Sequence, residues 1–219
     1  AFSEVTLGTR GEITAGAGVR LKKLASMAGA AGIGGFEWME GIPGNVGGAL
    51  RMNAGAMGIE TFDQVVRVTF LDEDGVIRTR ERDEIVSSYR NVTELRRNFA
   101  LQAVFKGKPD KPENIKQRWN ESREKRKATQ PVMASAGCTF KNPEEMPAGK
   151  LIDSLGLKGA SVGHAAVSEV HGNFLVNQGG ASAGEMLRLI DSIQKKARTE
   201  QGIELEPEIK ILGEDEAQF

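Results

Sequence analysis

The 219-residue sequence predicts an α+β protein, with more strand than helix in its first half. Three observations indicate this class. Short segments with alternating apolar residues, such as Glu12–Ala15, are typical of strands. Other, longer segments place apolar residues at helical spacing on one face. In addition, ten of the 27 glycines lie between Gly29 and Gly58, a concentration that neither regular helix nor regular strand favours.

Three segments are predicted to form helices. Val19–Ala31 carries one apolar face, and Ala183–Glu200 repeats apolar residues every three to four positions. Glu113–Lys127 is highly charged, with Ile115 and Trp119 as its inner face. Because six basic residues stand against three acidic ones in this segment, it is either a solvated helix or a contact for an anionic ligand.

Strands are predicted in several places. Val65–Leu71 and Val76–Thr79 flank an Asp-Gly turn and predict a hairpin, since glycine adopts a positive φ without a Cβ clash. Alternation predicts a further strand at Phe99–Phe105 and a half-exposed edge strand at Ile203–Leu212. Residues 107–112 hold two prolines and three charges, which predicts a break in both helix and strand and therefore a domain boundary.

Charge and cysteine content exclude several classes of protein. With 29 basic and 30 acidic residues, the chain lacks the basic excess of a domain that binds nucleic acid. One cysteine cannot form an internal disulfide, so we expect the protein to lie in a reducing compartment, the cytoplasm. Because this cysteine and the two histidines do not have the spacing of zinc ligands, we expect no metal site. The longest stretch without a charged residue has 15 residues, short of a membrane span of about 20. No signal peptide is visible.

The glycine-rich stretch is the first candidate ligand site. Gly41–Ala49 and Asn53–Gly58 contain more glycine than turns require. Such segments expose backbone N–H groups and let a phosphate or a flat ring approach closely, although a tightly packed structural crossing would also need glycine. The stretch matches neither the dinucleotide-binding fingerprint nor the Walker A loop, so generic motifs do not identify a ligand.

Several motifs together resemble one known family. Gly34–Ala49 and Met52–Ala56 are very similar to the flavin-binding stretch of the UDP-N-acetylenolpyruvoylglucosamine reductases, the MurB family of bacterial peptidoglycan synthesis. Seven later segments match the same family in the same order: Ser88–Arg90, Gln130–Pro131, Ala136–Pro143, Gly149–Asp153, Gly156–Gly159, Val167–Phe174 and Leu205–Ile209. The resemblance covers nearly the whole chain, and ordered motifs of this number make coincidence implausible.

The resemblance implies a fold and a reaction. Residues 1–110 would form a partial FAD-binding domain of the PCMH type, and residues 111–200 a MurB-type α/β substrate-binding domain. Residues 201–219 would form a returning strand that completes the active site, with the substrate bound between the domains. The reaction would be the NADPH-dependent, FAD-mediated reduction of UDP-N-acetylglucosamine enolpyruvate to UDP-N-acetylmuramate. We expect a monomer that acts on this small UDP-sugar, without a nucleic-acid or membrane partner.

Three catalytic roles follow from the resemblance. Cys138 occupies the position of the family's proton donor. A single cysteine is otherwise commonly an unreactive residue of the apolar core. A free thiol has a pKa of about 8.5 and is therefore protonated at neutral pH, so it can donate a proton. Arg90 would bind the enolpyruvyl carboxylate, although many arginines are surface ion-pair partners. Glu208 would stabilise or protonate the enolic intermediate. The pattern alone places Glu204, Glu206 and Glu208 on one face and does not rank them.

Binding roles also follow from the resemblance. FAD would contact Gly41, Ile42, Pro43, Gly44, Gly47, Gly48, Asn53, Ala54 and Gly55. The substrate would contact Tyr89, Arg126, Gln130, Lys141, Asn142 and His171. His171 is explained equally well as a histidine bonded to the backbone in an ordinary loop.

One part of the family pattern has no counterpart. The family's flavin domain begins with another glycine-rich loop, which contacts the FAD pyrophosphate, whereas Phe2–Val5 already resembles the strand after it. We therefore expect that the sequence lacks the N-terminal part of this domain. A non-catalytic fragment that binds UDP-sugar or flavin is one alternative. A flavin-linked oxidase of the same fold is another, but it should lack the Gly137-Cys138 and Pro207-Glu208 motifs. A nucleic-acid-binding module built on the charged helix ranks last.

Overall fold

The computed structural model describes residues 2–213 and forms two compact units, divided between Arg126 and Lys127. We call them unit 1 and unit 2. The division falls further along the chain than residue 110, where the sequence predicts a boundary. The reason lies in helix α3 (Pro112–Thr129), whose Ile115 is buried and whose Trp119 packs against the apolar core of unit 1.

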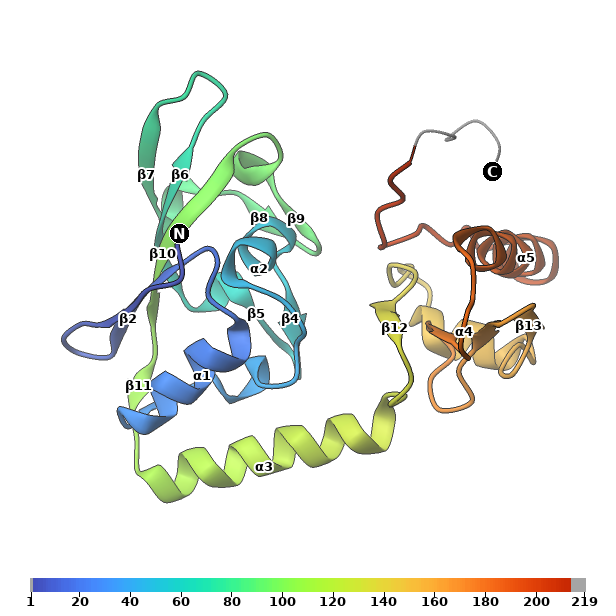
Figure 1. Ribbon diagram of the computed structural model, residues 1–219, viewed down its shortest axis with the longest axis horizontal. Coiled ribbons are helices and arrows are strands. Elements are labelled where there is room, and N and C mark those ends of the chain that lie inside the picture. Colours follow the sequence, from blue (N-terminus) through green and yellow to red (C-terminus); the bar gives the residue numbers. More distant parts are fainter. Residues whose placement is uncertain (1, 214–219) are drawn as a thin grey trace. The chain divides into compact units, whose positions relative to one another are not determined.

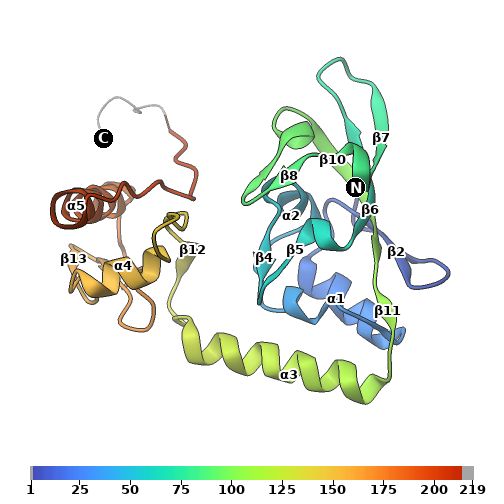
Figure 2. The same cartoon turned by 180° about the vertical axis from the view of Figure 1, so that it is seen from behind.

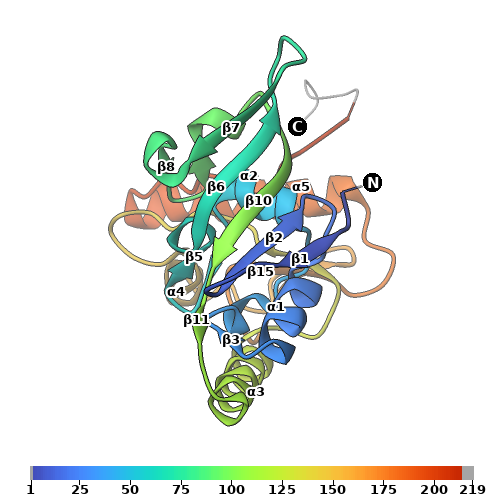
Figure 3. The same ribbon diagram turned by 90° about the vertical axis from the view of Figure 1, so that its left-hand side faces the viewer.

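Unit 1 is built on a five-stranded antiparallel sheet. Its strands are β1 (Val5–Leu7), β2 (Glu12–Gly16), β6 (Val65–Leu71), β7 (Ile77–Glu81) and β10 (Phe99–Lys106). They lie side by side in the order β1-β2-β10-β6-β7, which Figure 3 shows face-on. The predicted strand at Glu12–Ala15 and the predicted β6–β7 hairpin are confirmed.

Two helices cover one face of this sheet. Figures 1 and 2 show α1 (Leu21–Ala30) and α2 (Val46–Met52) on the same side of it. The apolar face predicted for the first helix is confirmed, because Leu21, Leu24, Ala25 and Ala28 are all buried. Burial of these side chains in the core of unit 1 is what stabilises the helix.

Short elements complete unit 1. Three two-stranded ribbons pair β3 (Ile33–Gly34) with β11 (Lys108–Pro109), β4 (Gly55–Ala56) with β5 (Ile59–Glu60), and β8 (Ser87–Ser88) with β9 (Asn91–Val92). Four single 3-10 turns are η1 (Glu37–Met39), η2 (Thr61–Asp63), η3 (Arg82–Glu84) and η4 (Thr93–Leu95).

Strand β10 is confirmed, but its side chains do not alternate regularly. Its register with β6 shifts between Ala100 and Gln102 and again between Val104 and Phe105. An irregularity of this kind rotates the following side chains to the other face. Phe105 is therefore fully buried, whereas Phe99 is 70% exposed.

Residues 107–112 separate strand β10, which ends at Lys106, from helix α3, which begins at Pro112, but they are not irregular throughout. Lys108 and Pro109 pair with Gly34 and Ile33, and a ribbon of two residues tolerates a proline because few ladder donors are needed. Pro112 is the first residue of α3, a position where the N–H has no intrahelical partner in any helix. The helix predicted at Glu113–Lys127 is confirmed.

Unit 2 contains a four-stranded antiparallel sheet and two helices. The strands β12 (Ser135–Cys138), β13 (Ser161–Val162), β14 (Ala165–Val167) and β15 (Phe174–Asn177) lie in the order β12-β15-β14-β13. The helices are α4 (Ala148–Ser154) and α5 (Ala183–Gln201). The predicted second long helix is confirmed as α5, which begins with a capping box at Ser182 and ends at Gly202, in left-handed conformation.

The strand predicted at Ile203–Leu212 does not form. This segment makes one isolated bridge, between Pro207 and Phe140, and is otherwise irregular. Its alternation has another cause: Ile203 and Leu205 are buried in the core of unit 2, Ile209 packs partly against the same core, and Glu204 and Glu206 are exposed. Within residues 2–213, no helix is long and apolar enough to cross a membrane.

Replacing Phe105 by alanine is expected to lower the free energy of unfolding of unit 1 by about 3–5 kcal/mol, because it leaves a cavity beside Phe36, whose ring it meets edge-on. Urea unfolding followed by tryptophan fluorescence measures this, since both tryptophans, Trp38 and Trp119, lie in unit 1. Phe99→Ala on the same strand is the control, with a change below about 0.5 kcal/mol. Equal losses in the two variants would contradict the burial pattern.

Candidate functional site

Two of the three predicted catalytic residues lie at one corner of unit 2. Cys138 ends strand β12 and is paired with Phe174 of β15. Glu208 lies in the segment after α5, and its backbone N–H donates to the carbonyl of Thr139 over 2.8 Å. The cysteine is half-buried, and one carboxylate oxygen of Glu208 is buried. Segments far apart in the sequence thus bring a thiol and a carboxylate to the same corner.

The side chain of Asn173 holds this corner together. Its amide oxygen accepts from the N–H of Phe140 over 2.9 Å, and its amide nitrogen donates to the Phe140 carbonyl over 2.8 Å. The carbonyl of Asn173 also accepts from Thr139. On the opposite side, the N–H of Lys141 donates to the Glu206 carbonyl over 2.8 Å. The backbone that follows Cys138 is therefore bonded on both edges.

Pro207 fits this arrangement despite its missing N–H. It lies opposite Phe140, and the two hydrogen bonds of the bridge come from the N–H groups of Lys141 and Glu208. Residues in a pair of this kind do not bond to each other, so the proline costs no hydrogen bond. It also leaves Glu208 next to the bridge, one residue after the proline, where the family resemblance places it.

The third predicted catalytic residue, Arg90, belongs to unit 1. With Tyr89 it forms the turn between β8 and β9, and its φ is +56°. This left-handed conformation costs a residue with a side chain about 1 kcal/mol, and such strain is concentrated at functional sites. The guanidinium of Arg90 lies 4.6 Å from the centre of the Tyr89 ring, and the tyrosine is exposed.

The glycine-rich stretch contains glycines of two kinds. A Cβ atom on Gly47 would lie 3.1 Å from Ala17, and one on Gly55 would lie 2.8 Å from the Ile59 carbonyl, so packing requires these two. A Cβ atom on Gly44 or Gly48 would meet nothing within 4 Å. The structural interpretation therefore applies at Gly47 and Gly55, whereas Gly44 and Gly48 leave room for a ligand.

A pocket of about 510 Å³ lies against the first part of this stretch. It is lined by Gly41–Asn45 together with Arg20, Lys22 and Glu40. Pro43 is exposed, while Ile42 and Ala54 pack against the core of unit 1. Lys22 is paired with Glu40 at 3.3 Å, so Arg20 leaves the lining with a net positive charge. Together with the open backbone, this charge makes the pocket suitable for an anionic group such as a pyrophosphate.

The side chain of Asn53, another predicted flavin contact, serves the fold. Its amide nitrogen donates to Glu60 over 2.6 Å and to the Ser88 carbonyl over 3.3 Å, and its amide oxygen accepts from Phe62 over 3.1 Å. These bonds tie the end of α2 to the β4–β5 and β8–β9 ribbons. Asn53 is buried and has a φ of +42°, which asparagine tolerates better than most residues.

The predicted substrate-binding residues come from both units. Arg126 donates to the carbonyl of Gly41 in unit 1, and Gln130 follows the end of α3. In unit 2, the ammonium of Lys141 pairs with Glu206, and the Asn142 amide oxygen accepts from the N–H of Ala148 at the start of α4, over 3.0 Å. Lys141 and Asn142 thus flank the corner that holds Cys138.

His171 is hydrogen-bonded to the backbone, and its partner is a backbone N–H group rather than a carbonyl. Its Nδ1 accepts from the N–H of Asn173 over 3.2 Å, and its ring meets Phe174 with centres 4.9 Å apart. Burial lowers the pKa of His171 below its ordinary value of 6.5, and the positive charge of Lys158 acts in the same direction. The neutral imidazole is therefore the form that the fold accommodates.

Two features of these sites have no sign in the sequence. Asn173 is an uncharged side chain within a loop, and only the structure reveals its paired bonds to Phe140. The buried carboxylate of Glu37 is the other: it pairs with Arg118, which also pairs with Asp110. In the described part of the chain, no group of three or more His, Cys, Asp or Glu side chains is arranged to hold a metal ion.

Two family models match the chain. A model described as an FAD binding domain matches residues 4–80, which lie in unit 1. A model of the C-terminal domain of UDP-N-acetylenolpyruvoylglucosamine reductase matches residues 129–212, which lie in unit 2. Each match falls within one unit, and Tyr89, Arg90 and Arg126 lie between the two matched ranges.

Curated relatives extend this similarity over nearly the whole chain. The UDP-N-acetylenolpyruvoylglucosamine reductase of Agathobacter rectalis is 46% identical over 92% of this chain and 65% of its own length. That of Pelobacter propionicus is 40% identical over 98% of this chain and 72% of its own length. The chain belongs to the UDP-N-acetylenolpyruvoylglucosamine reductase family. It spans about two thirds of the length of these relatives.

A solved structure supports the same assignment to the family. The crystal structure of UDP-N-acetylenolpyruvylglucosamine reductase (MurB) from Thermus caldophilus is 38% identical, with a TM-score of 0.82 over 94% of this chain and 73% of that one. The predicted family, and the predicted α+β combination of an FAD-binding domain with a MurB-type C-terminal domain, are confirmed.

The stability of unit 2 in this MurB-family chain is expected to fall as the pH drops below about 6.5, the ordinary histidine pKa. Because the pKa of His171 is lowered in the folded state, the unfolded state binds its proton first. The stability that the neutral His171 contributes to unit 2 is fully present above pH 6.5. It is lost progressively as the pH falls from 6.5 to the pKa of His171 in the folded state. The His171 Cε1–H signal in an NMR titration should have its midpoint below 6.5, and a midpoint at or above 6.5 would refute the expectation. His171→Gln should abolish the dependence, whereas His164→Gln should retain it.

Proposed function

We propose that this protein carries out the NADPH-dependent, FAD-mediated reduction of UDP-N-acetylglucosamine enolpyruvate to UDP-N-acetylmuramate in peptidoglycan biosynthesis. The main support for this proposal is the corner of unit 2, where the backbone N–H of Glu208 donates to the carbonyl of Thr139, the residue after Cys138. Membership in the reductase family and the match of both family models support the same proposal. The flavin-linked oxidase alternative does not account for this corner.

We further propose that unit 1 holds the flavin. The open space at Gly44 and Gly48 fits a bound planar or phosphate-bearing group, because backbone N–H groups are accessible where no Cβ intervenes. Arg20 and Lys22 in the adjoining pocket would interact with a pyrophosphate. When bound, FAD would supply the substrate with the hydride that originates from NADPH.

The chain's own residues would perform the remaining chemistry. The thiol of Cys138 would hold the proton that is transferred to the alkene carbon not attacked by the hydride. The Glu208 carboxylate would stabilise the enolic intermediate, and the planar guanidinium of Arg90 would bind the substrate carboxylate on which negative charge develops. Lys141 and Asn142, three and four residues after Cys138, would contact the sugar nucleotide.

Cellular context follows from the proposed substrates. NADPH and UDP-sugars are small, charged molecules of the cytoplasm, and an unoxidised cysteine as proton donor requires a reducing compartment. We therefore propose a cytoplasmic enzyme that acts as a monomer on small molecules, without a nucleic-acid or membrane partner.

Gly48→Ala is expected to weaken FAD binding at least about tenfold, a change of about 1.4 kcal/mol, because the new methyl group enters the space proposed for the flavin. Stability should not fall, since alanine favours a helix over glycine by about 0.5–1 kcal/mol. Retained flavin absorbance after dialysis, together with thermal unfolding, measures both quantities. Gly184→Ala, in the first turn of α5, is the control and should leave FAD binding unchanged. Failure of the unaltered chain to retain flavin would favour the non-catalytic alternative.

Cys138→Ala is expected to abolish reduction of the UDP-sugar while NADPH oxidation by the flavin-loaded protein continues, because only the later step needs the thiol proton. Cys138→Ser should retain partial activity, since a hydroxyl can donate a proton less readily. Product formation by chromatography and NADPH absorbance in single turnover separate the two steps. Full turnover in the alanine variant would remove Cys138 from the proposed role.

A further inference from the structure

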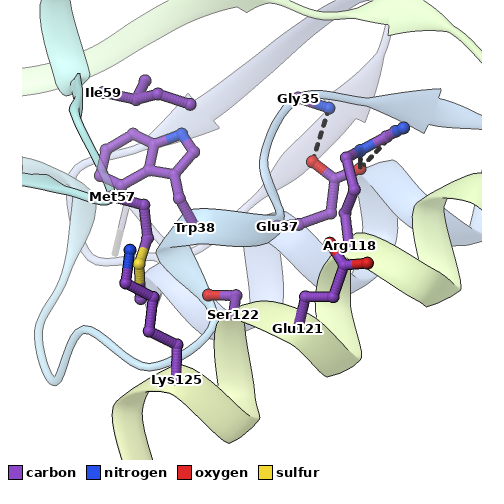
Figure 4. Close-up of a pocket in the computed structure, with 9 residues that line it drawn as sticks. All are labelled: Gly35, Glu37, Trp38, Met57, Ile59, Arg118, Glu121, Ser122 and Lys125. Carbon is purple, nitrogen blue, oxygen red and sulfur yellow. Dashed lines mark hydrogen bonds and ion pairs between the residues drawn. The ribbon is translucent and has the colours of Figure 1, made fainter. Parts of the chain in front are cut away.

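A second pocket in unit 1 shares only Met57 with the glycine-rich stretch Gly41–Ala49 and Asn53–Gly58. Its volume is about 300 Å³. Its walls come from the η1 turn, the β4–β5 ribbon and one face of helix α3, and none of its residues is a predicted catalytic residue, flavin contact or substrate contact. Figure 4 shows its lining residues: Gly35, Glu37, Trp38, Met57, Ile59, Arg118, Glu121, Ser122 and Lys125.

One wall of this pocket is apolar and held in place. It consists of Trp38, Met57 and Ile59, which lie together across from the helix in Figure 4. The indole N–H of Trp38 donates to the Gln64 side chain over 2.9 Å, and Gln64 in turn donates to the Gly35 carbonyl over 2.8 Å. The indole is therefore fixed in orientation, and its polar atom is already bonded. What this wall offers a ligand is an apolar and aromatic surface.

The opposite wall is a polar face of α3. Arg118, Ser122 and Lys125 are spaced four and three residues apart and so share one side of the helix. Ser122 is 8% exposed, and its hydroxyl oxygen is buried with no hydrogen-bond partner within residues 2–213. Figure 4 shows this hydroxyl pointing into the space below Trp38 and Met57. A buried hydroxyl without a partner is unfavourable, and a ligand that bonds to it would relieve that cost.

The charges around the pocket select against an anionic ligand. The guanidinium of Arg118 is paired with Glu37 at 2.8 Å and with Asp110 at 2.7 Å. These partners, Asp110 foremost, raise the pKa of Arg118, so its positive charge is permanent and already balanced. Glu121 also lines the pocket and accepts a hydrogen bond from Gln117. Lys125 is the second cation of the lining, so the ionisable side chains bring two charges of each sign. A carboxylate ligand would lose its hydration without a net positive charge to replace it.

We propose that this pocket binds a neutral aromatic molecule that carries a hydroxyl group. The ring would lie against Trp38, Met57 and Ile59, and the hydroxyl would bond to Ser122. The volume is at the lower end of the range for small-molecule sites, which suits one substituted ring rather than a dinucleotide such as NADPH. Offset or edge-on contact with the fixed indole adds to the apolar burial.

Phenol is the simplest probe of this class, since it is neutral at pH 7. Titration of the 15N-labelled full chain with phenol should shift the indole N–H signal of Trp38 in a saturable way. The chain has two tryptophans, and Trp119→Phe assigns their signals. Toluene, which has no hydroxyl, and benzoate, which is charged, are expected to bind at least about fivefold more weakly, the effect of about one hydrogen bond.

Ser122→Ala tests the proposed hydrogen bond. Alanine is the better helix former, so the variant is expected to fold, and thermal unfolding verifies this. Its phenol affinity should fall about fivefold, to that of toluene, whereas toluene affinity stays unchanged. Asn120→Ala, an exposed position on the same helix, is the matched control and should bind phenol as the unaltered chain does. Unchanged phenol affinity in Ser122→Ala, or tighter binding of benzoate than of phenol, would overturn the proposal.

Discussion

Phe140 is bonded along both edges of its backbone, and the candidate catalytic corner depends on that double attachment. On one edge the Asn173 amide closes a pair of hydrogen bonds, and on the other the segment Glu206–Glu208 forms a bridge. The ring of Phe140 is fully buried at the same time. Loss of the Asn173 amide would leave two buried backbone groups unbonded, which is more costly than the loss of an exposed bond.

This attachment explains why a thiol and a carboxylate from distant segments can be kept in a constant relation. Cys138 precedes the clamped residues on β12, and Glu208 follows the bridging proline. Neither residue is positioned by a long regular element, because the bridge has one residue on each strand. A short bridge supported by a buried side-chain amide holds the backbone in place at one residue. The side chains of neighbouring residues take no part in it and are available for other contacts. That suits a site whose side chains must also contact a substrate.

Glycine has two separate functions in unit 1. At Gly47 and Gly55 a side chain would collide with the chain itself, so glycine there serves packing. At Gly44 and Gly48 the surrounding space is open, but Gly44 also has a φ of +156°, which a residue with a side chain rarely adopts, so only at Gly48 does neither packing nor φ require glycine. The two pockets of unit 1 also differ in what they offer a ligand. The pocket beside the glycine-rich stretch is lined largely by the residues Gly41–Asn45. The pocket below Trp38 is lined mainly by side chains, and its polar atom without a hydrogen bond is the Ser122 hydroxyl oxygen.

By itself the sequence determined the family, the α+β class and the elements whose apolar residues face a core. The helices at Leu21–Ala30 and Ala183–Gln201 were predictable because local periodicity and burial agree there. The helix at Pro112–Thr129 was predictable from its charge spacing, and the β6–β7 hairpin from its Asp-Gly turn. Tertiary structure decided the rest. Ile203–Leu212 alternates like a strand but lacks a partner beyond one bridge, and Phe99 is rotated outward by a register shift. Strand pairing, bulges and the Asn173 clamp are contacts between distant segments, and local pattern carries no information about which distant backbone groups meet.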